Sequence, residues 1–212
     1  MRKKLQFVVT AGPTREYIDP VRFLSNPSTG KMGFAVARAA AARGHAVTLV
    51  AGPVSLPTPK GVSRVDVTSA RDMLAAVASA VKAAPDAVLV AAAAVADWRP
   101  ASCAAKKLKK SRMSGVLRLV RNPDILMSVK TSVKVGFAAE TDNVMKEAAR
   151  KLREKGLAMI VANDVTEDGA GFGTDTNRVA LLRGDGSVER LPMMAKLAVA
   201  RRIVRACEDI CP

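Results

Sequence analysis

The sequence predicts an α/β protein of the Rossmann-like, three-layer type, with helices on both faces of a mostly parallel sheet and a C-terminal antiparallel hairpin. Two observations support this fold class. Short apolar runs typical of buried strands alternate along the chain with longer helical patterns. The 212 residues are 49% hydrophobic and 3% aromatic, enough for one core built mainly from small aliphatic side chains. We therefore expect a single domain over residues 1–212.

Each expected element follows from its local pattern. Strands are expected near residues 5–10, 46–50, 62–67, 87–92, 133–138 and 158–162, where short apolar runs occur. Helices are expected near residues 31–43, 70–83, 123–131, 143–155 and 193–209. Pro123 and Asp124 favour a helix start, because proline fits the first helical position and an acid suits the first turn. Residues 178–183 and 188–191, joined by a Gly-Asp-Gly turn, predict the hairpin as an antiparallel edge of the sheet.

Composition limits the class of partner. The formal net charge of +15 indicates acidic partners, although basic residues on solvated helix faces explain part of the excess.

No apolar run reaches the roughly 18–20 residues of a membrane span, and none fits a signal peptide. The three cysteines have no metal-like or redox-like spacing, which favours a reduced, cytoplasmic protein. His45, the only histidine, lies in a turn, so we expect a solvated loop residue and no histidine-based catalysis.

Residues 25–33 form a polar, glycine-bearing turn between the first strand and the first long helix. Free N–H groups at such a helix start, together with the helix dipole, favour the binding of an anion. The spacing excludes a P-loop, because Met32 follows Gly30-Lys31 and Ser25 stands where the first glycine is required. It also lacks the Gly-x-Gly-x-x-Gly fingerprint of dinucleotide binding. Close packing of the helix on the strand explains Gly30 and Gly33 equally well.

Polar residues gather where the strands end. Ligands of open α/β sheets bind beyond the carboxyl ends of the strands, which here are followed by residues 10–15, 91–99, 136–141 and 163–165. The alanine run that leads to Asp97 lets a ligand approach the backbone, although tight strand packing also explains alanine. Asp97 can cap a turn, contact a ligand or hold a metal through water.

The densest basic tract spans residues 99–121. It contains no acid, and its first part has no helix or strand period, so we expect a mobile cover that closes over a polyphosphate. A solvated loop and an RNA contact remain alternatives, but only Trp98 is near, and single-strand binders interleave aromatics with basic residues. The basic residues are Arg99, Lys106, Lys107, Lys109, Lys110, Arg112, Arg118 and Arg121.

Lys151 and Lys155 lie four residues apart on one expected helix face. Glu147 lies one turn before Lys151, so a salt-bridged surface face explains this spacing without a ligand.

Six motifs in order, at residues 25–33, 93–97, 107–110, 122–125, 136–141 and 162–164, resemble those of the bacterial phosphopantothenoylcysteine synthetases, also called phosphopantothenate–cysteine ligases. The resemblance covers essentially the whole chain. In many bacteria this domain is the C-terminal half of a bifunctional protein of coenzyme A biosynthesis. The flavin-dependent decarboxylase half is missing from this sequence, so we expect no FMN here and either a fused or a separate decarboxylase partner.

The resemblance implies a CTP-dependent ligation in two steps. The carboxylate of 4′-phosphopantothenate attacks the α-phosphate of CTP to give an acyl-cytidylate and pyrophosphate, and the amine of L-cysteine then displaces CMP. It further implies Mg²⁺ with the CTP and a homodimer with active sites near the subunit interface. We expect no nucleic-acid or membrane partner. The competing hypotheses are a nucleic-acid-binding protein that uses the basic tract and a short-chain-type NAD-dependent reductase.

Site residues are assigned by position in the resembling motifs. Asn26 and Lys107 are the catalytic candidates: Asn26 would hold the acyl-cytidylate and its carbonyl, and Lys107 would contact the triphosphate. Arg22 would meet the phosphate of phosphopantothenate, which Asn26 and Ala94 also bind. Lys106 departs from the family pattern, which commonly has an acid at this position, immediately before the cover-loop lysine. The nucleotide-binding candidates are Ala91, Ala92, Ala93, Asp97, Lys107, Asn122, Pro123, Asp124, Ile125, Phe137, Lys151 and Lys155; no metal ligand is assigned.

Overall fold

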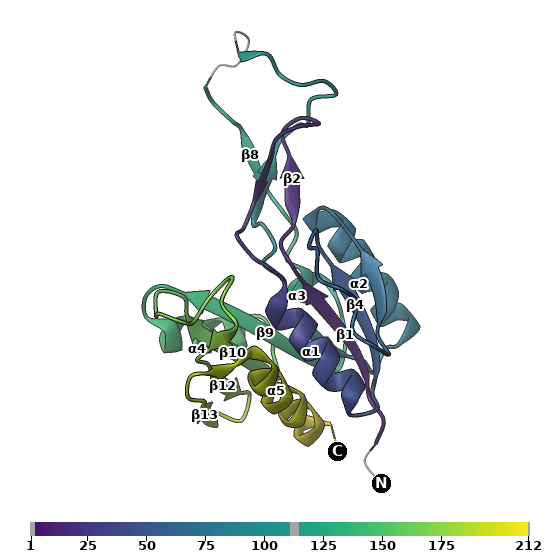
Figure 1. Cartoon of the computed structure of the whole chain (residues 1–212), viewed down its shortest axis with the longest axis vertical. Coiled ribbons are helices and arrows are strands. Elements are labelled where there is room, and N and C mark those ends of the chain that lie inside the picture. The colour runs from purple at the N-terminus through teal and green to yellow at the C-terminus, as the bar shows by residue number, and fades with distance from the viewer. Residues whose placement is uncertain (1–2, 111–114, 212) are drawn as a thin grey trace.

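The computed structural model describes residues 3–110 and 115–211, and these residues form three layers (Figure 1). The middle layer is an eight-stranded sheet in the order β13-β12-β10-β9-β6-β1-β4-β5. From β10 to β5 all neighbours pair in parallel, in the 3-2-1-4-5-6 order of dinucleotide-binding folds. The predicted fold class is confirmed. The strands are β1 (Gln6–Ala11), β4 (Ala46–Ala51), β5 (Ser63–Asp66), β6 (Val88–Ala91), β9 (Val133–Glu140), β10 (Met159–Asp164), β12 (Ala180–Arg183) and β13 (Val188–Arg190).

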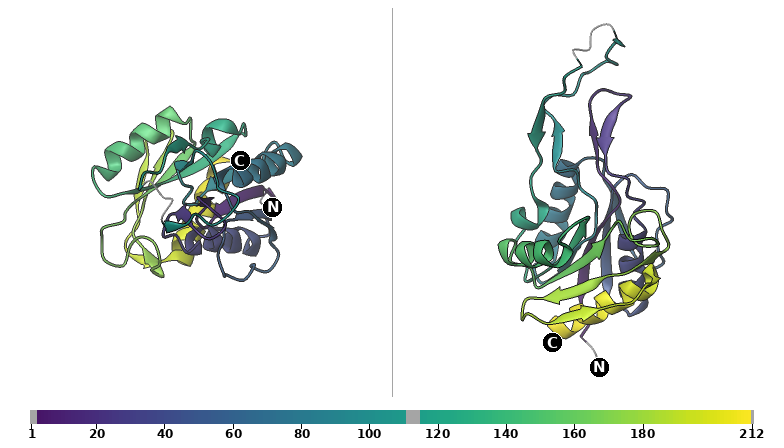
Figure 2. Two further views of the ribbon diagram at one scale, coloured as in Figure 1. Left: turned by 90° about the horizontal axis from the view of Figure 1, so that it is seen from above. Right: turned by 90° about the vertical axis from the view of Figure 1, so that its left-hand side faces the viewer.

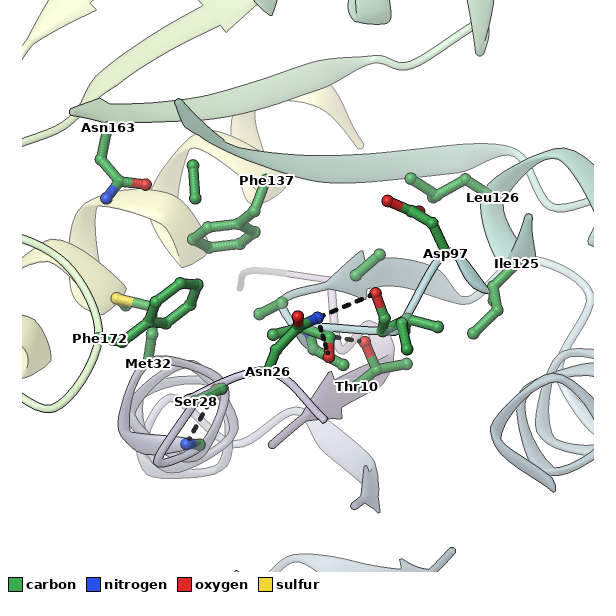
Figure 3. Close-up of a pocket in the computed structure, with 18 of the residues that line it drawn as sticks. Thr10, Asn26, Ser28, Met32, Asp97, Ile125, Leu126, Phe137, Asn163 and Phe172 are labelled. Atoms are coloured by element: carbon green, nitrogen blue, oxygen red, sulfur yellow. Dashed lines mark hydrogen bonds between the residues drawn. The ribbon is translucent and has the colours of Figure 1, made fainter. Parts of the chain in front are cut away.

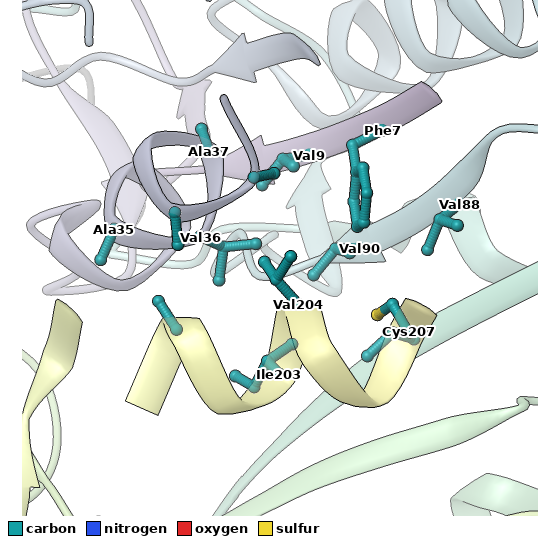
Figure 4. Packing of buried hydrophobic residues seen from close by; sticks show 14 of the residues in the cluster. Phe7, Val9, Ala35, Val36, Ala37, Val88, Val90, Ile203, Val204 and Cys207 are labelled. Carbon is teal, nitrogen blue, oxygen red and sulfur yellow. The ribbon is translucent and has the colours of Figure 1, made fainter. Parts of the chain in front are cut away.

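Helices cover both faces of this sheet. On one face α1 (Lys31–Ala42) and α5 (Lys196–Ile210) pack against the central strands (Figure 4). There Val204 and Cys207 of α5 lie against Phe7 of β1 and Val90 of β6 (Figure 4). The other face carries α2 (Ala70–Ala83), α3 (Ile125–Ser128) and α4 (Val144–Glu154). No helix in the described parts of the chain combines the length and the apolarity that a bilayer crossing needs.

Most predicted elements agree with the structure to within one or two residues. The C-terminal hairpin is confirmed, because β12 pairs antiparallel with both β10 and β13. The helix expected at residues 123–131 is shorter, since it covers only α3. Asp124 caps it by accepting a hydrogen bond from the N–H of Met127 at 3.1 Å, and the chain is already extended at Val129.

Two short antiparallel ribbons were not predicted, and together they form an arm that projects from the body (Figures 1 and 2). The first pairs β2 (Arg15–Tyr17) with β3 (Phe23–Ser25). The second pairs β7 (Trp98–Pro100) with β8 (Leu119–Arg121), so the two ends of the basic tract are strands. Arg112 lies outside the described residues. A further two-stranded sheet, β11 (Thr176–Asn177) with β14 (Met194–Ala195), precedes α5.

The expectation of a solvated His45 is wrong, because the turn after α1 is tucked against α5. The His45 side chain is buried, and its ring lies 5.1 Å from that of Phe7. Its Nδ1 accepts a hydrogen bond from the N–H of Leu5 at 3.2 Å, and its Nε2 lies 2.8 Å from Oε1 of Glu208. His45 therefore ties the start of β1 to the end of α5.

Candidate active site

A pocket of about 470 Å³ opens at the carboxyl ends of β1, β6, β9 and β10 (Figure 3). Its lining begins at Thr10 of β1 and Ala91 of β6, which are the neighbouring strands at which the strand order reverses. Sheets of this topology bind their ligands at that reversal, because the loops after the two strands diverge to opposite faces. The fold therefore places this pocket where a small-molecule ligand is expected.

The start of α1 forms one side of the pocket. Gly30, the residue before the helix, has φ of +78°, and no side chain of the described residues caps the helix. Gly33 is pressed onto β1: a Cβ there would lie 2.5 Å from Cβ of Ala11 and 2.7 Å from the carbonyl oxygen of Thr10. The two explanations of the glycines, close helix–strand packing and an anion-binding helix start, therefore both apply. The close packing brings a helix start with free N–H groups to the pocket.

Asn26 lines the pocket and lies between Phe172 and Asp97 in the view of Figure 3. Its Nδ2 donates hydrogen bonds to the carbonyl oxygens of Ala94 at 3.1 Å and Val95 at 3.2 Å. The hydroxyl of Thr10 accepts a hydrogen bond from the N–H of Ala93 at 3.1 Å. These contacts fix the loop after β6 in place, and its alanines leave the backbone open to a ligand.

Asn122 fixes the opposite wall rather than pointing its amide at a ligand. Its Nδ2 donates to the carbonyl oxygen of Ala96 at 2.8 Å, and its Oδ1 accepts from Arg99 at 3.1 Å. Its backbone N–H donates to the carbonyl oxygen of Asp97, also at 2.8 Å. The exposed carboxylate of Asp97 bonds to none of the described residues, so it does not cap a turn and is available to a ligand.

Lys151 and Lys155 face the pocket, and neither pairs with Glu147. Nζ of Lys151 lies 2.6 Å from Glu140, and Nζ of Lys155 lies 2.7 Å from Asp124. Glu147 pairs instead with Arg150. The explanation of a salt-bridged surface face is therefore wrong in its partners. Both lysines line the pocket, where their positive charge can attract an anionic ligand.

The pocket gathers all but two of the candidate residues predicted from the sequence. Arg22 and Lys107 lie in the arm and do not line the pocket. Arg22 pairs with the buried carboxylate of Asp19, which also accepts a hydrogen bond from the N–H of Leu108 at 3.1 Å. The residues that line the pocket are Asn26, Ala91, Ala92, Ala93, Ala94, Asp97, Asn122, Pro123, Asp124, Ile125, Phe137, Lys151 and Lys155. Their individual roles stay predictions.

Sequence reasoning missed a group of lining residues on the side of α1. Phe172, Asn177 and Lys196 line the pocket there, next to Met32. Phe172 lies in a glycine-rich segment, residues 169–173, that follows β10. Such a run after a strand end was the available signal, because glycines there let a loop turn back over the sheet edge.

The described residues contain no group of three or more histidine, cysteine, aspartate or glutamate side chains that could hold a metal ion. Asp97 and Asp124 are the carboxylates of the pocket lining, and Asp124 already pairs with Lys155. This donor set suits an ion that arrives on a phosphate ligand and retains its waters, because Mg²⁺ commonly needs only one or two protein carboxylates.

Comparison with known proteins identifies the family. Residues 2–210 match the model of the DNA/pantothenate metabolism flavoprotein C-terminal domain. The chain is 46% identical over 215 residues to the coenzyme A biosynthesis bifunctional protein CoaBC of Escherichia coli and 48% identical over 203 residues to that of Bacillus subtilis. These alignments cover 96% and 93% of this chain but 52% and 50% of the relatives. The chain thus spans about half the length of these relatives.

Solved structures agree with this assignment. A crystal structure of the C-terminal domain of a CoaBC protein superposes with a TM-score of 0.83 at 42% identity, over 100% of this chain and 97% of that one. A Streptococcus pneumoniae DNA/pantothenate metabolism flavoprotein, at 24% identity and a TM-score of 0.80 over 98% of this chain and 100% of that one, shares the fold. The chain therefore belongs to the family of DNA/pantothenate metabolism flavoprotein C-terminal domains.

Proposed function

We propose that this domain is a phosphopantothenate–cysteine ligase that uses CTP. The observation that supports this best is the pocket at the strand reversal, which combines a helix start, four lysines, a free carboxylate and Asn26 in one lining. Such a lining suits a phosphate-rich nucleotide beside a second small anion. The family membership and the bifunctional coenzyme A biosynthesis relatives favour the same reaction.

The first step activates a carboxylate, whose oxygen is a poor leaving group. In the proposed reaction the carboxylate oxygen of phosphopantothenate forms a bond to the α-phosphorus of CTP, and pyrophosphate leaves. The pocket contributes charge stabilisation and positioning, because it holds lysines and free N–H groups but no histidine among its lining residues. We assign the phosphates to the positive groups of the pocket, namely the start of α1, Lys151 and Lys155, and the remainder of the nucleotide to the wall formed by residues 122–125.

The second step joins the acyl group to cysteine. The amine nitrogen forms a bond to the acyl carbon, the bond from that carbon to the phosphate oxygen breaks, and CMP leaves. Both N–H groups of the Asn26 amide are occupied by the carbonyls of Ala94 and Val95. Its Oδ1 is therefore the atom that remains to accept a hydrogen bond from the incoming amine, and we assign Asn26 to this step rather than to the acyl carbonyl.

We propose that the protein acts as a homodimer in which the arm of one subunit serves the pocket of the other. Arg22 and Lys107 lie outside the pocket of their own subunit. The arm also exposes apolar side chains, both in its strands and in the segments that connect the two strands of each ribbon. Such exposed apolar side chains favour a protein contact. These side chains, which are 38–82% exposed, are Val21, Phe23, Trp98, Val116, Leu117 and Leu119.

Mg²⁺ belongs to the proposal as an ion carried by the nucleotide. When bound, it would neutralise charge on the phosphate oxygens. Asp97 is the lining carboxylate without an ion pair, so it is the residue suited to hold such an ion, directly or through water.

The setting of this domain is proposed by analogy with its longer relatives. Because those relatives are bifunctional and the matched part is a C-terminal domain, we propose a flavin-dependent decarboxylase as a fused half or separate partner, with FMN held there. We also propose a cytoplasmic location and no nucleic-acid or membrane partner.

A nucleotide panel tests the function. The protein is incubated with phosphopantothenate, cysteine, Mg²⁺ and CTP, ATP, GTP or UTP in turn, and mass spectrometry follows the amide product. We expect the amide, CMP and pyrophosphate with CTP only. Amide formed equally with ATP would overturn the nucleotide assignment, and no amide with any nucleotide would overturn the ligase itself. Tight, salt-sensitive oligonucleotide binding that CTP does not displace would favour the nucleic-acid alternative.

A further inference from the structure

The segment of residues 169–175, which includes the glycine-rich residues 169–173, contributes Gly171 and Phe172 to the pocket lining beside α1. Phe172 in this segment lines the pocket and is 43% exposed. In Figure 3 its ring lies near Met32 and Phe137, on the side of Asn26 that is away from Asp97. The ring therefore shields one side of the cavity in which Asn26 lies.

Lys196, the first residue of α5, holds this segment in shape. Its side chain is buried, with 6% of the residue exposed. Its Nζ donates hydrogen bonds to the carbonyl oxygens of Gly171 at 2.8 Å and Thr174 at 2.7 Å, the two residues that bracket Phe172 and its neighbour. Its backbone N–H donates to the carbonyl oxygen of Asp175 at 2.9 Å. A buried ammonium is costly unless it is fully bonded, and here its bonds all go to this one segment.

A second lysine fastens the same segment to the start of α1. Nζ of Lys31 donates to the carbonyl oxygen of Gly173 at 2.9 Å and to Oδ1 of Asp175 at 2.7 Å. This ion pair lowers the pKa of Asp175. Gly171 and Gly173 have φ of +107° and +84°, so the backbone on either side of Phe172 has the left-handed form that glycine favours. The ring thus projects from a segment that is held on both sides.

We propose that Phe172 is a water-excluding wall of the active site and that Lys196 is the residue that positions it. The proposal rests on the ligase function proposed above. An acyl-cytidylate is open to hydrolysis: the oxygen of water forms a bond to the acyl carbon, the bond from that carbon to the phosphate oxygen breaks, CMP leaves, and protons pass to solvent. A closed apolar wall suppresses this side reaction while the intermediate waits for cysteine.

The test measures CMP release without cysteine. The wild-type protein, given phosphopantothenate, CTP and Mg²⁺ alone, should form its intermediate with a single burst of pyrophosphate and then release CMP slowly. In Phe172→Ala we expect the burst to persist and the slow CMP release to rise about ten-fold, because water then reaches the acyl carbon. Phe172→Leu keeps an apolar cover and should remain close to the wild type.

Lys196→Met should raise the same cysteine-independent CMP release, and Lys196→Arg, which retains the charge and the donors, should restore part of the protection. Because Lys196 acts through Phe172, the double variant Phe172→Ala/Lys196→Met should release CMP no faster than Phe172→Ala. Arg201→Ala, an exposed change on the same helix, is the matched control.

Unchanged CMP release in Phe172→Ala would overturn the proposal, and it does so even if the Lys196 variants fold poorly. Faster release in Phe172→Ala together with wild-type release in Lys196→Met would remove the positioning role. A wild-type protein that gives no pyrophosphate burst would instead refute the ligase function, so the two failures are distinguishable.

Discussion

The guanidinium of Arg22 donates a hydrogen bond to the carbonyl oxygen of Leu108 at 2.9 Å, although 86 positions separate the two residues. This contact joins the tip of the β2–β3 ribbon to the segment that carries Lys107. The N–H of Ala104 also donates to the carbonyl oxygen of Ile18 at 2.9 Å, which joins the same two parts of the arm. The two candidate residues that lie outside the pocket are therefore held together and should act on the same pocket.

The shared arm predicts complementation between two inactive variants. If the arm serves the partner's pocket, a heterodimer of an Asn26→Asp subunit with a Lys107→Gln subunit has one pocket with both residues intact. We expect such a heterodimer, purified through two different tags, to regain about half of the wild-type activity per dimer. If each arm served its own pocket, every pocket would lack one residue, and the heterodimer would be as inactive as its parents.

Asp19 makes the anchoring of the arm dependent on pH. Its hydrogen bonds from Arg22 and from backbone N–H groups outweigh its burial, so the pKa of its carboxyl lies well below the ordinary value of 3.8. A carboxyl with a lowered folded-state pKa stabilises the fold above its ordinary pKa and loses that contribution as the pH falls below it. We expect Asp19→Asn to lower the melting temperature at pH 7 and the difference from the wild type to shrink below about pH 4. A difference that is constant from pH 7 to pH 2 would contradict this anchor.

Asn26→Asp should separate the two steps of the proposed reaction. A carboxylate cannot donate to the carbonyls of Ala94 and Val95, so the side chain would turn away from them and no longer hold the amine. We expect a normal pyrophosphate burst, accumulation of acyl-cytidylate, and an amide-forming rate that falls about 100-fold or more. Rapid-quench mass spectrometry measures both species. Amide formation at the wild-type rate would remove Asn26 from the second step.

The parallel sheet could be predicted from the sequence because its strands, apart from the exposed edge strand β5, are short apolar runs buried on both faces. The ribbons of the arm could not. Strands of three residues, such as β7 and β8, carry no usable period, and their pairing joins residue 98 to residue 121 across the basic tract. That pairing is fixed by contacts made only after folding, among them the guanidinium of Arg121 over the ring of Trp98 at 5.3 Å.

The site was predictable where its residues lie in the loop after a strand, as Asp97 lies in the loop after β6. Lys196 was not, because it lies at the start of the last helix and reaches the pocket only through the fold. The prediction of a solvated His45 was wrong for a related reason. Its turn is polar in sequence, and only the packing of α5 buries the side chain. Local pattern thus locates the strand ends, and long-range packing decides which other side chains join them.

Gly33→Ala should destabilise the fold at the point where α1 meets β1. The added Cβ would lie within 3 Å of both Ala11 and the carbonyl oxygen of Thr10, so the helix start must shift. We expect a loss of about 1–3 kcal/mol in the free energy of unfolding, measured in urea. Gly184→Ala is the control: its nearest neighbour is 3.6 Å away, and the change should be neutral or stabilise by about 0.4–1 kcal/mol. Equal effects of both substitutions would show that the close approach is relaxed in solution.

His45→Ala separates a structural histidine from a catalytic one. Removing the ring leaves the buried N–H of Leu5 without its acceptor and Glu208 without one of its partners, although Arg43 still pairs with Glu208 at 2.6 Å. We expect a loss of about 1–3 kcal/mol in the free energy of unfolding, the cost of an unsatisfied buried donor. Because His45 does not line the pocket, kcat for the amide product should stay at the wild-type value while the variant is folded. The opposite outcome, normal stability with lost turnover, would mean that the only histidine takes part in the chemistry and that charge stabilisation and positioning alone do not account for catalysis.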